Sequence, residues 1–241
     1  MKGIDLSHHN PPASVPWDGV EFVGVRVTYG TTLDKLAEVH LRAAHDRGIT
    51  CLLAYHYQNM SAPGDAQARA FLERTHALED ALGLPRLGLA TDLEDLPAPA
   101  KPWPREEYAA IADAFAVELA EHIRRPLGVY GSPSFLDELV LSARVTSGPL
   151  WLAHHTSAPA PRMPRAWSRW AIWQHAVDTL PGGAKIDRNR CRLDPAAWRA
   201  LWTPPDPHPE LGGVVRATRA AMGLGDGADT FVTRDEGPII E

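Results

Sequence analysis

Two carboxylates, Asp92 and Glu94, stand two residues apart near the end of an apolar stretch. The stretch begins at residue 87 and is bounded by glycine and prolines, which predicts a buried strand. Side chains two residues apart leave a strand on the same face, so we expect both acids to project together. Proximity and apolar surroundings keep one carboxyl protonated near neutral pH while the other is ionised, which suits acid/base cleavage of a glycosidic bond.

The overall composition limits the classes of protein to consider. A chain of 241 residues, 44% of them hydrophobic, has the usual length of a single α/β barrel. The net charge is −6 and no block of lysine or arginine occurs, so nucleic acid is not an expected partner. The N-terminus lacks the apolar segment of an export signal, and no long apolar run follows, so we expect neither a signal peptide nor membrane insertion. Cys51 and Cys191 show no paired spacing, and a free buried thiol is the expectation for Cys51.

Strand-like and helical segments alternate through the first two thirds of the chain. The strand-like segments are residues 3–7, 22–27, 49–57, 87–95, 127–131, 149–155, 170–175 and 185–189. The helical segments are residues 33–46, 66–82, 105–123, 134–141 and 195–202. Alternation favours a parallel sheet, and the late strands follow one another without full helices between them. We therefore expect an α/β fold, a modified TIM-like barrel whose last third is short of helices.

Further polar residues fall at predicted strand ends, where such a barrel builds its site. Asp5 lies near the end of the first strand. Arg26 lies inside a β-branched run, and because a buried arginine normally needs a carboxylate partner we expect an ion pair there, with a surface arginine as the alternative. Tyr55 and Tyr57 suit a sugar-binding platform, and a packed aromatic edge is the other interpretation.

The composition changes after Trp202. The proline-rich residues 203–209 predict a stiff linker. Residues 206–241 are too few to build a core of their own, so we expect a tail that packs on the domain or on a docking partner. This divides the chain into a barrel of residues 1–203 and a linker and tail of residues 204–241.

A set of short motifs follows the order found in one known family. These motifs are Gly3-Ile4-Asp5-Leu6-Ser7-His8-His9, Trp17-Asp18, residues 22–27 with the embedded arginine, Tyr55-His56-Tyr57, Asp92-Leu93-Glu94, Val129-Tyr130, Leu150-Trp151-Leu152-Ala153, Ile172-Trp173-Gln174 and Ile186-Asp187-Arg188-Asn189. Together they resemble the glycoside hydrolase family 25 lysozymes, the muramidases of bacterial cell-wall lysis. The resemblance covers residues 3 to about 202.

The resemblance implies a (β/α)5(β)3 barrel and cleavage, without metal or other cofactor, of the β-1,4 bond between N-acetylmuramic acid and N-acetylglucosamine in peptidoglycan glycan strands. By motif, Glu94 corresponds to the general acid and Asp92 to its partner, while Asp5 and Asp187 correspond to two further acids of the groove. The implied substrate-binding residues are Tyr55, Tyr57, Tyr130, Trp151, Trp173 and Gln174, to which we add Arg26. Attack on the anomeric carbon by the substrate's own acetamido oxygen and direct attack by water both remain open.

The chain departs from the family pattern in two loops. Asn10-Pro11-Pro12 stands where the family often has Gln-Gly, and the strand with Arg26 continues into Tyr29 and Gly30 without an acidic residue before the glycine. Both departures fall in loops expected at the edge of the groove. They bear on substrate preference more than on the acids.

Two other functions compete with this interpretation. A metal-dependent hydrolase would draw its ligands from His8, His9, His56, His154, His155 and Asp92. Adjacent histidines on a strand face opposite sides, so each pair offers at most one ligand, which disfavours such a site. The second competitor is a non-catalytic wall-binding or structural module on the same barrel. A chelator would test the first, and a Glu94→Gln variant the second.

Without an export signal, a wall hydrolase needs another route to the wall, such as a holin-type pore or a virion. We therefore expect a phage or prophage type of lysin that stays in the cytoplasm until release. Among the remaining residues, we expect Trp198 and Trp202 to pack in the core, and His40 and His45 to lie on a helix surface. Asp95 fits a loop cap or a fifth groove acid.

Overall fold

The structure is a computed structural model that describes residues 1–95, 102–180 and 182–202. The chain divides into two units, Met1–Pro204 and Pro205–Glu241. The predicted linker and tail, residues 204–241, lie outside the described residues. Within the described ranges, none of the helices combines the length and the hydropathy needed to cross a bilayer.

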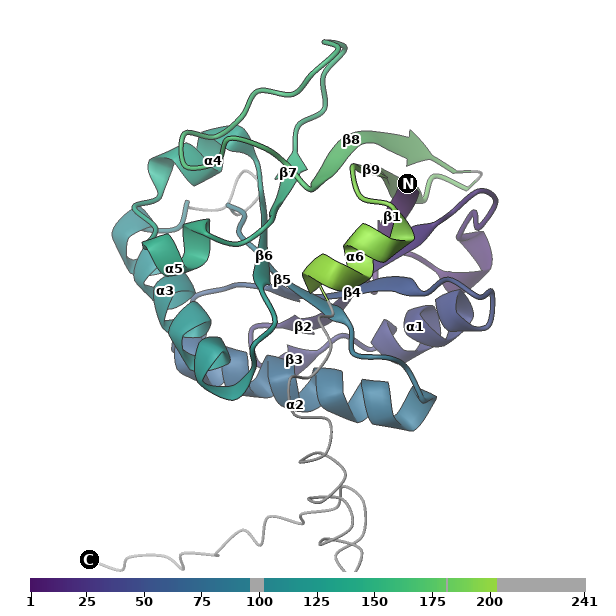
Figure 1. The fold of residues 1–241 in the computed structure, drawn as a ribbon, viewed down its shortest axis with the longest axis horizontal. Coiled ribbons are helices and arrows are strands. Elements are labelled where there is room, and N and C mark those ends of the chain that lie inside the picture. Colours follow the sequence, from purple (N-terminus) through teal and green to yellow (C-terminus); the bar gives the residue numbers. More distant parts are fainter. Residues whose placement is uncertain (96–101, 181, 203–241) are drawn as a thin grey trace, which may run out of the picture. The chain divides into compact units, whose positions relative to one another are not determined.

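Eight strands close into a barrel (Figure 1). In the order of the ring they are β1 (Lys2–Leu6), β2 (Phe22–Tyr29), β4 (Cys51–Tyr57), β5 (Gly88–Asp92), β6 (Leu127–Gly131), β7 (Leu150–Ala153), β8 (Ile172–Thr179) and β9 (Lys185–Cys191). Neighbours from β1 to β8 pair in parallel, whereas β9 runs antiparallel to both β8 and β1. The short strand β3 (Thr32–Leu33) forms a hairpin with β2 outside the ring.

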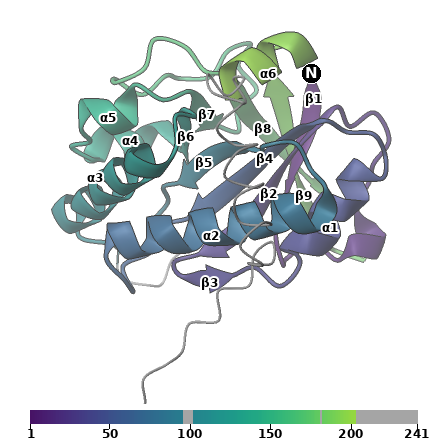
Figure 2. The same ribbon diagram turned by 60° about the horizontal axis from the view of Figure 1, so that its bottom comes forward.

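Helices cover the barrel over its first two thirds (Figure 2). In chain order they are η1 (Pro12–Ser14), α1 (Ala37–His45), α2 (Gly64–Leu82), α3 (Arg105–His122), α4 (Pro133–Glu138) and α5 (Ala143–Thr146). Among the described residues, no helix connects β7 to β8 or β8 to β9, and α6 (Pro195–Trp202) follows β9. The predicted barrel, with helices missing from its last third, is confirmed.

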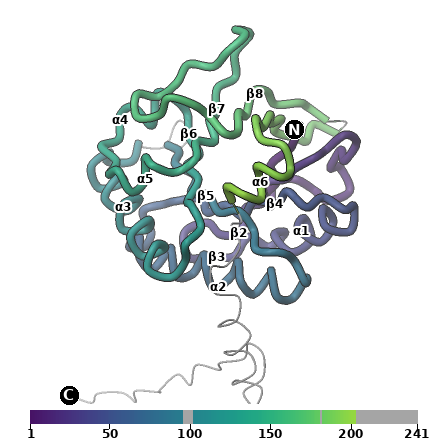
Figure 3. The backbone as a smooth tube through the Cα atoms, viewed as in Figure 1, coloured from purple at the N-terminus to yellow at the C-terminus, as the bar shows by residue number. Residues whose placement is uncertain are grey.

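The first and last strands of the barrel lie side by side near the N-terminus (Figure 3). Strand β1 pairs with β9, and the Met1 amino group donates to the Cys191 carbonyl oxygen at 2.8 Å. Because β9 closes the ring in the reverse direction, its beginning meets the end of β1. This reversal brings the first and last strands of the barrel into one site.

The strands separate two apolar cores. Every second side chain faces the helices, and the others fill the barrel. Trp198 and Trp202 of α6 are buried and pack into the lower end of the barrel against Phe22 and Leu53. The ring of Trp202 occupies the space that a Cβ at Gly128 would need, since the two would approach to 2.5 Å. The prediction that both tryptophans are core residues is confirmed.

One predicted helix begins later than its sequence pattern indicated. Leu33 belongs to β3, and α1 starts only at Ala37, because Asp34 accepts a hydrogen bond from the Leu36 N–H at 3.0 Å and turns the chain into the helix. His40, expected on the helix surface, is fully buried with Nε2 3.2 Å from the Ser7 carbonyl oxygen. That prediction was wrong, since His40 lies on the face of α1 that packs on the barrel.

Candidate active site

The carboxyl ends of the strands present polar side chains to the barrel interior. On four of the strands, barrel alternation places them an even number of residues from an apolar interior position at Phe22, Leu53, Ala90 or Ile172. Asp187 joins them although β9 runs backwards, since Asp187 pairs directly with Asp5 in the register of β9 and β1. The contributing residues are Asp5, Arg26, Tyr55, Tyr57, Asp92, Tyr130, Trp151, Gln174 and Asp187.

These side chains enclose a cavity of about 370 Å³. Glu94, just past the end of β5, completes the wall beside Asp92, as its spacing predicted. The cavity also includes His9 and His155, to which the sequence interpretation gave no role in sugar binding. All of the predicted site residues line this cavity except Trp173.

Trp173 faces away from the cavity. On β8, Ile172 belongs to the core inside the barrel and Gln174 lines the cavity, so the residue between them points outward. Its indole Nε1 donates to the His154 carbonyl oxygen at 2.8 Å, and its ring lies 5.7 Å from the guanidinium carbon of Arg190. Trp173, which the resemblance implied as a sugar-binding residue, therefore lies outside the cavity.

A second cavity, of about 490 Å³, adjoins the first. Tyr57 and Glu94 line both cavities. Glu94 therefore lies at the junction of the two cavities. The other residues of the second cavity are Leu93, Asp95, Arg105, Ser132, Ser134, Phe135 and Glu138.

A chain of amide and ring hydrogen bonds holds Asp5 in place. Its Oδ2 accepts from Gln174 Nε2 at 3.1 Å and from Asn189 Nδ2 at 2.6 Å. Asn189 in turn accepts from Trp151 Nε1 at 2.8 Å, and Gln174 accepts from the Tyr130 hydroxyl at 3.0 Å. Sequence reasoning gave Asn189 no role. Its position two residues after Asp187, on the same face of the strand, was the available signal.

The four acids share one electrostatic environment. Burial and the neighbouring Asp187 raise the pKa of Asp5 from 3.8 to about 7. Burial, followed by the charges of Glu94 and Asp5, raises the pKa of Asp92 well above its usual value. Burial also raises the pKa of Glu94, and the neighbouring Tyr130 hydroxyl offsets part of this rise. Like charges confined together cannot all ionise, so this group holds protons near neutral pH.

Asp92 offers a polar atom without a partner. Its Oδ1 is buried and, among the described residues, has no hydrogen-bond partner. A buried acceptor left unpaired is costly, and such atoms occur where a ligand later supplies the donor. Asp92 also lines the cavity, so this oxygen is a candidate acceptor for an N–H or O–H of a substrate.

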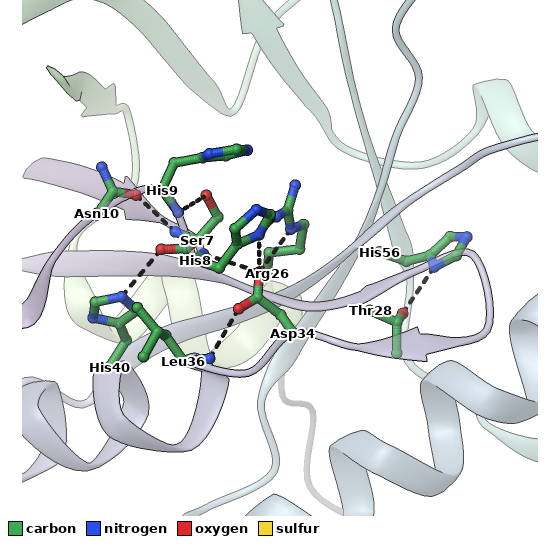
Figure 4. Close-up of polar contacts among 10 residues, drawn as sticks. All are labelled: Ser7, His8, His9, Asn10, Arg26, Thr28, Asp34, Leu36, His40 and His56. Atoms are coloured by element: carbon green, nitrogen blue, oxygen red, sulfur yellow. Dashed lines mark hydrogen bonds and ion pairs between the residues drawn. The ribbon is translucent and has the colours of Figure 1, made fainter. Parts of the chain in front are cut away.

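Arg26 brings a positive charge to this acidic cavity. Its Nε donates to Asp34 Oδ2 at 2.9 Å, which confirms the carboxylate partner expected from the sequence (Figure 4). The same carboxylate accepts from the backbone N–H groups of His8 and Leu36, each at 3.0 Å. Burial alone would raise the pKa of Asp34, but these hydrogen bonds and Arg26 outweigh it and lower that pKa.

The histidines of the described ranges lie in different surroundings. His56 faces the helices, where Nδ1 lies 2.8 Å from Thr28 Oγ1 (Figure 4) and Nε2 lies 3.1 Å from Gln67 Oε1. His9 and His155 face the cavity with the acids. Among the residues that the structure describes, no group of three histidines, cysteines or acids is placed to hold a metal ion.

Fold and site together fit one class of protein, a barrel hydrolase whose carboxylates gather at the carboxyl end of the strands. Residues 4–182 match Glycosyl hydrolases family 25, so the chain belongs to that family and is a glycoside hydrolase.

Known relatives agree with this assignment. The chain is 25% identical over 213 residues to Lysozyme M1 of Streptomyces globisporus, which is 83% of this chain and 70% of that protein. The muramidase from Acremonium alcalophilum has a TM-score of 0.66 at 23% identity, over 86% of this chain and 100% of that chain. The bacterial lysozyme from Streptomyces coelicolor has a TM-score of 0.65 at 22% identity, over 85% of this chain and 98% of that chain. These structures share the fold.

Proposed function

We propose that this glycoside hydrolase is a lysozyme that cuts the β-1,4 bond between N-acetylmuramic acid and N-acetylglucosamine in bacterial peptidoglycan. The observation that carries the proposal is the position of Glu94 beside Asp92, at the junction of two cavities. A glycan strand lying across this junction would place one sugar on each side of the acid. The substrate is therefore the glycan strand, and the place of action is the cell wall.

Glu94 is the proposed general acid. Burial raises its pKa and so favours the protonated carboxyl, whose proton passes to the glycosidic oxygen as the bond to the anomeric carbon breaks. The electron pair of the broken bond stays on the leaving oxygen. Ionised carboxylates among Asp5, Asp92 and Asp187 then stabilise the positive charge that develops on the sugar ring.

Asp92 is the proposed partner of the substrate's acetamido group. Its unpartnered Oδ1 would accept the amide N–H, which increases the electron density on the acetamido oxygen. That oxygen attacks the anomeric carbon, and water then opens the cyclic intermediate and returns a proton to Glu94. Two displacements retain the configuration of the anomeric centre, whereas direct attack by water would invert it.

The decisive experiment compares the wild type with Glu94→Gln on purified peptidoglycan. Loss of turbidity and release of new reducing ends are the readouts, and mass spectrometry of the ends identifies the bond. Glu121→Gln, an exposed carboxylate on α3, is the matched control. We expect Glu94→Gln to lose roughly 10²- to 10⁴-fold in kcat. Equal activity in wild type and Glu94→Gln would remove the acid role. A wild type that hydrolyses none of several peptidoglycans of different origin would favour a non-catalytic wall-binding module.

The catalytic unit of this proposal comprises residues 1–203. Residues 204–241 are proposed as a linker and tail outside the catalytic chemistry. A truncation after residue 203 should therefore retain hydrolysis of soluble glycan fragments.

A further inference from the structure

Tyr29, at the end of β2, extends the aromatic wall of the cavity outward. Its side chain is 41% exposed although its ring stacks on Tyr57, with ring centroids 5.1 Å apart and an angle of 25° between the planes. Tyr57 lines both cavities. The guanidinium carbon of Arg26 lies 6.0 Å from the centroid of each ring. Tyr29 is thus continuous with the site but more open to solvent.

A β-bulge directs Tyr29 toward this wall. The register between β2 and β4 is regular up to Arg26 opposite Tyr55 and then shifts before Thr28. Val27 packs in the core under the helices, and Thr28 contacts His56 on the same outer side, so two consecutive residues face outward. The extra residue restores the inward direction at Tyr29, which would otherwise face the helices.

The backbone around Tyr29 is held firmly. Gly30 adopts a left-handed conformation, with φ of +56°, and its N–H donates to the Tyr57 carbonyl oxygen at 3.0 Å. A side chain at this glycine would approach Asn59 Nδ2 to 2.5 Å, so the turn is closely packed. A ring presented by such a turn loses little conformational entropy when a ligand binds.

We propose that Tyr29 and Tyr57 form a further sugar-binding platform, which holds a pyranose ring of the glycan strand beyond the sugars at the cleaved bond. The electron-rich face of an aromatic ring suits the C–H groups on one face of a sugar, while the phenol hydroxyl stays in water. Thr32 pairs with Tyr29 in the β2–β3 hairpin and adds an exposed hydroxyl on the same side. This inference rests on the proposed function, since it needs a glycan substrate.

The surroundings favour a sugar over an apolar protein partner. The exposed Leu33 of the same hairpin pairs with Thr28, whose side chain faces the helices, so Leu33 does not widen the apolar surface beside Tyr29. A single tyrosine face continuous with a polar cavity matches the size of one sugar ring. It is too small for a stable protein interface.

The test measures KM and kcat on soluble peptidoglycan glycan strands of increasing length. We expect Tyr29→Ala to raise KM for long strands roughly 3- to 10-fold, the range for loss of one aromatic face, with a smaller effect on kcat and on the shortest cleavable strand. Tyr29→Phe keeps the ring and should retain most of the affinity. Tyr29→Leu still covers Tyr57 but lacks the aromatic face, so it should behave like Tyr29→Ala. Val39→Ala, an exposed apolar residue on α1, is the control.

Direct binding separates the possible failures. Calorimetric titration of long glycan strands into Glu94→Gln, with and without Tyr29→Ala, measures affinity without hydrolysis. The inference is overturned if Tyr29→Ala binds like its parent, or if Tyr29→Leu matches the wild type, which would give the ring only a covering role. It is also overturned if kcat falls equally for all strand lengths at constant KM. A wild type that cleaves no glycan would instead contradict the proposed function, and titration would still show whether Tyr29 contacts sugar.

Discussion

The guanidinium Nε of Arg26 donates to Oδ2 of Asp34 at 2.9 Å, with only 7% of the arginine side chain and none of the aspartate exposed. Arg26 also lines the acidic cavity, where its charge lowers the pKa values of Asp92 and Glu94 against the larger effect of burial. The ion pair therefore connects the packing of the β2–β3 hairpin with the protonation of the acids.

Replacement of Asp34 by asparagine should change both stability and pH dependence. Loss of the buried carboxylate leaves Arg26 without its counter-charge, which costs on the order of 3 kcal/mol in the free energy of unfolding. The arginine then attracts the cavity acids more strongly, so Glu94 loses its proton at a lower pH. We expect the alkaline limb of the profile of kcat against pH to move to lower pH.

Chemical denaturation and a pH series test this prediction. Glu38→Gln is the control, because its ion pair with Arg42 lies on the surface and should contribute less than about 1 kcal/mol. An Asp34→Asn protein as stable as Glu38→Gln, with an unmoved pH profile, would contradict the role of the pair.

The acid cluster should make the wild type less stable at neutral than at acidic pH. The pKa of Asp5 is raised from 3.8 to about 7 on folding, so its contribution is fully present below pH 4 and is lost as pH rises through about 7. The shift corresponds to an upper bound of about 4 kcal/mol. Asp5→Asn keeps an oxygen for the amides of Gln174 and Asn189 and removes the charge.

Asp5→Asn should therefore be more stable than the wild type at pH 8, by roughly 1–3 kcal/mol, while losing activity. Urea denaturation at several pH values measures both effects. If the wild type is most stable at pH 8, or if Asp5→Asn destabilises at that pH, the raised pKa is wrong.

Asn189 should act on catalysis through Asp5. Its amide fixes Asp5, and this hydrogen bond opposes the rise in the pKa of Asp5. Asn189→Ala also leaves the buried Trp151 Nε1 without its acceptor, at a cost of about 1–3 kcal/mol. We expect Asn189→Ala to have a lower kcat, and the acidic limb of its profile of kcat against pH to lie at higher pH. The outward-facing Arg188→Ala, which breaks an exposed ion pair with Asp178, should show neither effect.

The bottom of the barrel offers a test of packing alone. Gly128→Ala should destabilise by about 1–3 kcal/mol, because the new Cβ meets the buried ring of Trp202. The smaller ring of Trp202→Phe should relieve part of this clash. The double variant is then less destabilised than the sum of the single variants, as measured by denaturant unfolding. If the destabilisations of the two single variants are additive in the double variant, the Trp202 ring does not contact the new Cβ at position 128.

The outward direction of Trp173 predicts different effects at two neighbouring strands. Trp173→Phe should change the melting temperature but leave KM for glycan within about twofold, since the ring is outside the cavity. Trp151→Phe should raise KM, because Trp151 lines the cavity and loses its hydrogen bond to Asn189. If Trp173→Phe and Trp151→Phe raise KM equally, Trp173 contacts the substrate and the outward direction is contradicted.

Much of this protein is determined by its sequence alone. Apolar runs, glycine and proline boundaries and helical spacing placed the eight barrel strands and the late loss of helices, because these patterns report local burial. The spacing of Asp92 and Glu94 predicted their shared cavity for the same reason, since side chains alternate along any strand. The periodicity of apolar residues and the glycines and prolines at the ends of elements are local properties, which a single chain segment carries by itself.

The tertiary structure decided the rest, because strand direction, register and helix docking depend on distant partners. The reversal of β9 put Asp187 opposite Asp5 and brought Asn189 to the same carboxylate. Only the bulge in the β2–β4 ladder turned Tyr29 toward the cavity. The direction of Trp173 depends on which face of β8 turns toward the inside of the closed barrel. The burial of His40 depends on the docking of α1 on the barrel. A shift of one residue in register exchanges the two faces of a strand, and the sequence of that strand alone does not reveal it.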